Sequence, residues 1–248
     1  SDLKELQRKF INPELCDITE ALVYTEPYND ERGRNRVFPP IADFVKEKLY
    51  EDQGLHCEVA KLKMDFMTRA QSLIHGDLHT GSIFINEEST KVFDPEFCFY
   101  GPMGYDIGNV IANMIFAWAN GDAAGAADFC KWVEDVLVDV INMTKEKMEK
   151  YYDEHVTDTM CRNELYKKYY MDTIIEDTSA VAGLELIRRI VGMANVKDIT
   201  TIADEAKRAR AEKICITAAI DFIKNRSDKK CGKCFLKTLK DAIAEVDA

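Results

Sequence analysis

The spacing of apolar side chains is helical over the first part of the chain and becomes extended near its centre. Residues 1–30 predict an irregular, partly helical segment. A helix is predicted from about Ile41, and a second amphipathic helix covers residues 55–72. The period then shortens, because residues 82–86 and 91–94 are β-prone and enclose a polar turn. These two runs predict a β-hairpin.

From Gly104 to the C-terminus the helical period returns and persists. The predicted helices cover residues 105–119, 125–152, 160–175, 179–195, 202–226 and 232–246. The sequence therefore predicts a mainly α fold of the α+β class, with one small hairpin near its centre. Since a two-stranded hairpin cannot support itself, we expect this one to carry function.

Composition narrows the class of protein. Hydrophobic residues make up 46% of the 248 residues, which is typical of a globular core. The 33 basic and 44 acidic side chains leave a net charge of −11, which argues against a nucleic-acid partner. The longest apolar stretch, residues 110–119, is too short to span a bilayer, and residues 1–4 open no signal peptide. We therefore expect a cytoplasmic protein with no membrane partner.

Eight cysteines are scattered along the chain, mostly alone within apolar segments. Such scatter predicts buried, reduced thiols. Cys231 and Cys234 form the one close pair, but a structural zinc ion would need a second close pair of ligands, and no histidine lies near them in the sequence. Unligated thiols at a helix start are the expected state.

Three acidic side chains flank the predicted hairpin. The triplet His75-Gly76-Asp77 places a carboxylate on a tight loop, where glycine permits unusual backbone geometry. The hairpin then returns the chain, so that Asp94 is expected near Asp77. Because a proline follows Asp94, we expect an extended backbone there, with residues 94 and 96 projecting to the same side. Asp94 and Glu96 therefore predict a carboxylate pair of the ligand type that Mg²⁺ prefers.

This layout is typical of phosphoryl transfer. Asp77 would accept or orient the acceptor hydroxyl, and the carboxylate pair would hold Mg²⁺ on the nucleotide phosphates. The alternative interpretation is that Asp77 only caps a turn and that Asp94 and Glu96 are solvated. Any one of these acids alone would more often be structural. All three together, with His75 two residues before Asp77, favour function.

The same segment resembles a known family. The matching runs are Asp77-Leu78-His79-Thr80-Gly81-Ser82 and Asp94-Pro95-Glu96-Phe97-Cys98-Phe99-Tyr100-Gly101-Pro102-Met103-Gly104-Tyr105-Asp106-Ile107-Gly108. Through them the chain resembles the S-methyl-5-thioribose kinase family, within the aminoglycoside-phosphotransferase and choline-kinase-like superfamily. Residues 12–28 and 185–192 are similar to the same family, so that the resemblance extends over most of the chain.

The resemblance implies ATP-dependent phosphorylation of the 1-hydroxyl of 5-methylthioribose, a step of methionine salvage. It implies that Asp77 is the catalytic residue and contacts this hydroxyl. Asp94, Pro95 and Glu96 would line the ATP site, with Mg²⁺ on the two acids. Arg188 and Arg189 match a paired arginine at the sugar site. The implied partners are methylthioribose, ATP and a second copy of the enzyme in a homodimer.

Two features set limits on this interpretation. The position five after Asp77, which in protein kinases is an Asn that binds metal, is Ser82 here. No glycine-rich phosphate loop occurs, and Asp77 comes too early for an N-terminal ATP-grasping lobe to precede it. Residues 1–248 are therefore expected to form the C-terminal lobe of a protein-kinase-like fold, inactive by itself. The alternatives are a kinase for another small alcohol or sugar, such as choline, homoserine or an aminoglycoside, and a one-lobed binding protein without catalysis.

Weaker features remain open between structural and functional roles. The helical period does not decide which of Arg188 and Arg189 points into a site. Asp106 is expected to support the catalytic loop through backbone N–H groups. Trp118 belongs either to the sugar pocket or to the core, and Glu134 is expected on a solvated helix face.

Overall fold

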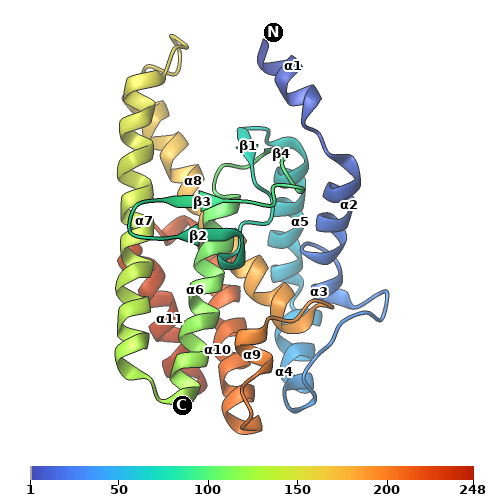
Figure 1. The fold of residues 1–248 in the computed structure, drawn as a ribbon. Helices are drawn as coiled ribbons and strands as arrows, with labels where there is room; N and C mark the ends of the chain where they lie inside the picture. Colours follow the sequence, from blue (N-terminus) through green and yellow to red (C-terminus); the bar gives the residue numbers. More distant parts are fainter. Residues whose placement is uncertain (1) are drawn as a thin grey trace.

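The computed structural model describes residues 2–248, and helices account for most of it (Figure 1). The N-terminal segment contains three helices: α1 (Asp2–Lys9), α2 (Pro13–Leu22) and α3 (Glu26–Asn29). A 3₁₀ turn (Pro39–Ile41), α4 (Ala42–Val45), a π-turn (Lys46–Tyr50) and α5 (Gln53–Thr68) follow. The predicted mainly α class is confirmed.

The C-terminal helices pack into a bundle (Figure 1), in which α8 packs against both α6 and α10. The bundle is formed by α6 (Tyr105–Ala124), α7 (Ala127–His155), α8 (Glu164–Val191), α10 (Glu205–Lys224) and α11 (Gly232–Val246), with the short α9 (Lys197–Thr200) before α10. Every residue of α8 from Asp177 to Ile187 is buried. A Cβ on Gly108 would lie 2.7 Å from the Thr178 carbonyl oxygen, so that only glycine allows α6 to approach α8 this closely.

The predicted hairpin is present and a second strand pair accompanies it. β2 (Ile83–Ile85) and β3 (Thr90–Val92) are antiparallel, with Ile83 opposite Val92. β1 (Ser72–Ile74) pairs antiparallel with β4 (Phe99–Gly101), with Ile74 opposite Phe99. Sequence patterning did not reveal this second pair, because strands of three residues are too short to show a period. It brings the two ends of the segment that contains all three candidate acids together.

Three predicted helices were wrong in their bounds. The helix expected over residues 55–72 ends at Thr68, because Ser72 already belongs to β1. The helices expected over 160–175 and 179–195 are one helix, α8. The polar residues between them do not break it, since Asp177 accepts a hydrogen bond from Arg69 Nη1 at 2.5 Å. An ion pair from outside the helix thus keeps a polar stretch inside the core.

The expectation for Glu134 was also wrong. Its side chain is buried, accepts a hydrogen bond from Trp118 Nε1 at 3.0 Å and forms an ion pair with Lys240. Trp118 is therefore a core residue whose indole N–H is satisfied by a buried carboxylate. Within residues 2–248, the helices are too short or too polar to cross a membrane.

Candidate active site

Asp77 lies on a tight loop directly after β1, and the backbone of this loop is fixed by Asp106. The N–H groups of His75 and Gly76 donate to the two carboxylate oxygens of Asp106, at 2.7 and 3.0 Å. Burial raises the pKa of the Asp106 carboxyl, and these two N–H donors oppose that rise. The supporting role predicted for Asp106 is confirmed. Because Asp106 is the second residue of α6, the loop is attached to the helical bundle.

Gly76 allows the turn that the loop requires. Its φ is +85°, in the left-handed region, and a Cβ at this position would lie 2.4 Å from the Phe97 carbonyl oxygen. The loop of Asp77 therefore packs directly on the turn that follows Asp94.

His75 connects the same two segments through hydrogen bonds. Its Nδ1 accepts from the Asp77 N–H at 3.3 Å, so that Nε2 carries the proton and donates to the Phe93 carbonyl oxygen at 2.9 Å. Phe93 is the residue before Asp94. One imidazole thus spans both backbones, so that the hairpin returns the residue before Asp94 to the loop of Asp77, as the sequence predicts.

The conformation expected at Asp94 was wrong. Its φ is +65°, in the left-handed region, and Glu96 lies in a turn instead of on an extended chain. The argument that an extended backbone aims both carboxylates to one side does not hold. The turn is instead held from the N-terminal segment, because Asn12 Nδ2 donates to the carbonyl oxygens of Glu96 and Cys98 at 2.9 and 3.1 Å.

The side chains at this turn are carboxylates, the ligand type that Mg²⁺ prefers. Asp94 and Glu96 are both exposed, and within residues 2–248 neither carboxylate has a hydrogen-bond or ion-pair partner. Among the same residues, no three His, Cys, Asp or Glu side chains form a metal-binding group. The two acids would thus supply a minority of the six oxygens around Mg²⁺, with water and phosphate as the others. Ser82 is buried, and its hydroxyl oxygen lies 3.3 Å from His79 Nε2.

Arg188 and Arg189, near the end of α8, both approach Asp77. Arg188 Nη2 donates to Asp77 Oδ1 at 2.7 Å, and Arg189 Nη2 lies 3.8 Å from the same oxygen. The structure therefore brings the predicted arginine pair and the predicted catalytic acid together. Only Arg188 is hydrogen-bonded to it.

Glu185, which sequence reasoning left without a role, holds both arginines. It forms an ion pair with Arg188 and accepts from Arg189 Nε at 2.9 Å, while its own side chain is 2% exposed. Burial alone would raise the pKa of Glu185, but the two guanidinium groups hold it below its ordinary value. The available signal was an acid three and four residues before two arginines on one helix. The two positive groups, Arg188 and Arg189, and the two negative groups, Glu185 and Asp77, make the cluster neutral.

The other carboxylate oxygen of Asp77 has no hydrogen-bond partner among the described residues. Asp77 Oδ2 lies 4.0 Å from His79 Nε2, beyond hydrogen-bond distance. Because Arg188 engages Oδ1, Oδ2 is the oxygen of Asp77 without a hydrogen bond among the described residues. A carboxylate oriented in this way can accept the proton of an alcohol.

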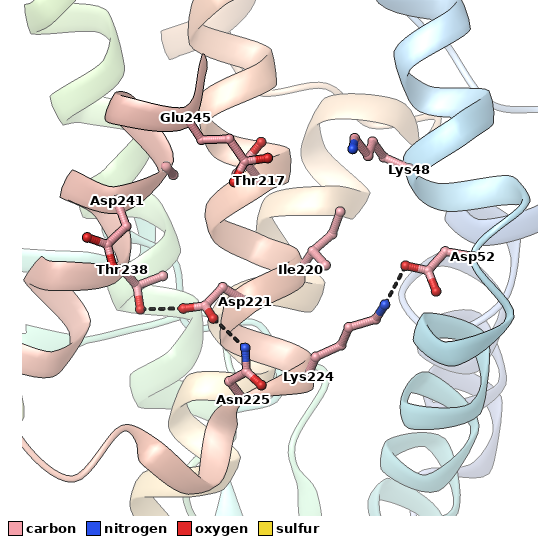
Figure 2. A pocket seen from close by; sticks show the side chains of 11 residues that line it. Lys48, Asp52, Thr217, Ile220, Asp221, Lys224, Asn225, Thr238, Asp241 and Glu245 are labelled. Atoms are coloured by element: carbon pink, nitrogen blue, oxygen red, sulfur yellow. Dashed lines mark hydrogen bonds and ion pairs between the residues drawn. The ribbon is translucent and has the colours of Figure 1, made fainter. Parts of the chain in front are cut away.

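Two open clefts lie elsewhere on the molecule. One, of about 340 Å³, separates α10 and α11 from the segment before α5 and contains Asp221, Lys224 and Asp52 (Figure 2). The other, of about 320 Å³, lies next to Phe10 and Phe66. None of the predicted site residues lines either cleft, so the chemistry of the acids and the arginines is separate from both.

A helical lobe with a loop aspartate, a hairpin and a following acidic turn is found in the class of small-molecule phosphotransferases. The chain belongs to the phosphotransferase enzyme family, whose sequence model matches residues 4–137. This match includes Asp77 and the turn of Asp94, and it ends within α7, before the arginines of α8.

Individual proteins similar to this chain indicate a more specific class than the family model does. The chain is 37% identical over 234 residues to methylthioribose kinase 1 of Oryza sativa subsp. japonica, covering 87% of this chain and 54% of that protein. It is 37% identical over 221 residues to a methylthioribose kinase of Bacillus pumilus, with 89% and 54% covered. A methylthioribose kinase of Escherichia coli O45:K1 is 35% identical over 238 residues, with 90% and 57% covered. The resemblance indicated by the motifs is confirmed. The chain spans about half the length of the curated relatives it matches.

Proposed function

We propose that the whole protein is an ATP-dependent methylthioribose kinase and that this chain is its catalytic and acceptor-binding lobe. The observation that carries the proposal is that Arg188 of α8 is hydrogen-bonded to Asp77, while His75 links the loop of Asp77 to Phe93, the residue before Asp94. In this proposal the arginines hold the sugar and the acidic turn after β3 holds the phosphates, so that both substrates meet at Asp77. The names and the identity of the relatives support the choice of methylthioribose as the acceptor.

In this proposal Asp77 Oδ2 accepts the proton of the 1-hydroxyl of methylthioribose, while the hydroxyl oxygen attacks the γ-phosphorus of ATP. The bond between the γ-phosphorus and the oxygen that bridges it to the β-phosphate breaks, and ADP leaves. Arg188 and Arg189 have N–H groups left for the hydroxyls of the sugar, because Glu185 engages only part of each guanidinium. Asp94 and Glu96 would hold Mg²⁺, which balances charge on the phosphates. With this arrangement the lobe acts mainly by positioning.

A nucleotide base would find a flat apolar surface close to the acidic turn. Phe84 and Phe93 stack with ring centroids 4.5 Å apart and an interplanar angle of 14°, and their side chains remain 64% and 40% exposed. Phe93 directly precedes Asp94. We assign this pair to the base of ATP and Pro95 to the same site.

The remaining half of the protein would complete the ATP site. The chain spans about half of its relatives, and the hairpin exposes Phe84, Ile85 and Val92. A second, ATP-grasping lobe covering these side chains would supply the cations that phosphoryl transfer needs opposite Asp94. In this proposal the lobe transfers no phosphate without that second lobe. The homodimer and the cytoplasmic location stay predictions.

The proposal is tested by acceptor-dependent ADP release from the full-length enzyme. Methylthioribose should give the highest kcat/KM, ahead of choline, homoserine and an aminoglycoside. Asp77→Ala should lower kcat by roughly 10²–10⁴ with a much smaller change in the KM for ATP. The matched control is Asp139→Ala on the exposed surface of α7. If Asp77→Ala keeps more than about a tenth of the wild-type kcat, Asp77 is not part of the mechanism.

A further inference from the structure

Two cysteine side chains meet at the start of α11, far in sequence from the candidate active site. Cys231 is the residue directly before the helix and Cys234 lies in its first turn. Their sulfur atoms are 3.0 Å apart, and both side chains are partly exposed. Neither residue takes part in the proposed phosphoryl transfer.

The surroundings of Cys234 favour its thiolate form. Burial acts to raise the pKa of Cys234, but the thiol of Cys231 and the backbone N–H groups of Lys230 and Cys231 outweigh it and lower the pKa. The start of a helix adds to this stabilisation of negative charge. At Cys16 and Cys215 burial prevails instead, raising the pKa of Cys16 to about 11 and also that of Cys215.

The backbone on both sides of the pair is held in place. The Gly232 N–H donates to Asn142 Oδ1 on α7 at 3.0 Å, and a Cβ on Gly232 would lie 2.3 Å from the Val138 carbonyl oxygen. Before the pair, Lys230 Nζ donates to Glu176 Oε1 on α8 at 2.7 Å. These contacts fix the first turn of α11 between two other helices.

Lys229 adds a further anchor through Asp221 of α10. Its Nζ donates to Asp221 Oδ2 at 2.5 Å, and the Thr238 hydroxyl donates to the same oxygen at 2.7 Å. Figure 2 shows the bond between Thr238 and Asp221 at the edge of the cleft. Because Thr238 belongs to α11, the residues before and after the two cysteines share one carboxylate.

We propose that Cys231 and Cys234 are a reversible dithiol–disulfide site that reacts with low-molecular-weight disulfides of the glutathione class. An S–S bond is about 2.05 Å long, so the sulfur atoms need to approach by about 1 Å, which side-chain rotation supplies while the anchored backbone stays in place.

The exchange proceeds in two balanced steps. The Cys234 thiolate attacks one sulfur of the oxidised disulfide, whose S–S bond breaks and releases one thiolate. The deprotonated Cys231 sulfur then attacks Cys234 Sγ in the mixed disulfide and releases the second thiolate. The two protein thiols are oxidised, the external disulfide is reduced to two thiols, and the two protons pass to them.

The test uses the purified chain in buffers of increasing oxidised-to-reduced glutathione ratio. Free thiols are blocked with N-ethylmaleimide, and the chain is digested with trypsin, which cuts after Lys230, Lys233 and Lys237. A disulfide then joins peptides 231–233 and 234–237 and lowers their summed mass by two hydrogen atoms. Reduction with dithiothreitol should separate them again. The proposal is overturned if the two peptides stay singly blocked while other cysteines are oxidised.

Single variants identify the attacking thiol. Cys231→Ser should trap glutathione on Cys234 at least roughly threefold faster than on the exposed Cys57, the internal control. Cys234→Ser should leave no linked peptides and slow labelling at Cys231. Labelling of Cys57 at the same or a higher rate than Cys234 would contradict the proposed order of attack. Since the linked peptides are measured on the unmutated chain, misfolding of a variant cannot decide the result.

Discussion

Arg188 Nη2 donates a hydrogen bond to Asp77 Oδ1 at 2.7 Å, across 111 residues of sequence. The contact joins the end of α8 to the loop after β1, and it orients the carboxylate that we propose as the catalytic group. Arg189, the next residue, lies 3.8 Å from the same oxygen. Neighbours in sequence thus have different distances from the same acid.

Exchange of each arginine for lysine should separate their roles. Lysine keeps the positive charge, but one ammonium group cannot hold Glu185 and Asp77 together as a guanidinium does. In the full-length enzyme, Arg188→Lys should lower kcat by about tenfold or more, as expected for the loss of one charged hydrogen bond. Arg189→Lys should change kcat less and act mainly on the KM for the acceptor. Steady-state kinetics of both variants decide this, and a reversed order would contradict it.

Glu185→Gln should destabilise the fold and weaken the acceptor site together. The amide carries no charge to balance the two arginines, whose side chains are only 15% and 21% exposed. We expect a loss of about 3 kcal/mol in the free energy of unfolding, as for other broken buried ion pairs. Urea unfolding measures this, with Glu164→Gln in the exposed first turn of α8 as the control. An unchanged midpoint of unfolding would show that Glu185 is not needed to balance the charge of the two arginines.

Asp94→Asn and Glu96→Gln should each raise the Mg²⁺ concentration needed for half-maximal activity by at least about tenfold, because neutral amides bind Mg²⁺ weakly. Glu88→Gln in the exposed turn of the hairpin is the matched control. If Glu96→Gln leaves the Mg²⁺ dependence unchanged, water fills that position. Ser82 is already engaged by His79 and is a poor substitute.

Asp177 should make one part of the stability depend on pH. Burial raises the pKa of its carboxyl to about 6, although Arg69 opposes this rise. Since the folded-state pKa exceeds the unfolded value, the contribution of Asp177 is greatest below the unfolded pKa and is lost as the pH rises to about 6.

Comparison with Asp177→Asn isolates that contribution. Urea titration measures the free energy of unfolding of the wild type and of the variant. Between pH 4 and pH 6, the wild type should lose stability relative to the variant. Asp139→Asn on α7 should show no such trend. A difference that grows over this range would mean that the pair with Arg69 lowers the pKa.

Local sequence was sufficient for most of the elements. The change of period near residue 82 predicted the hairpin, and the helix predicted over residues 232–246 has those bounds in the structure. The identity of Asp77 as the loop acid, and the support of its loop by Asp106, also followed from residue type and short spacing. Periodicity and turn chemistry are properties of adjacent residues, so one sequence contains them.

Contacts between distant segments decided the rest. Arg69 keeps α8 continuous through Asp177, and Asn12 holds the turn in which Asp94 takes a left-handed backbone. Glu185 was visible only as one acid among many until its burial placed it against both arginines. Which arginine bonds Asp77 depends on how α8 is rotated about its axis, and packing against α6 and α10 sets that rotation. A pattern along one chain does not encode such distances, because they arise only when the helices meet.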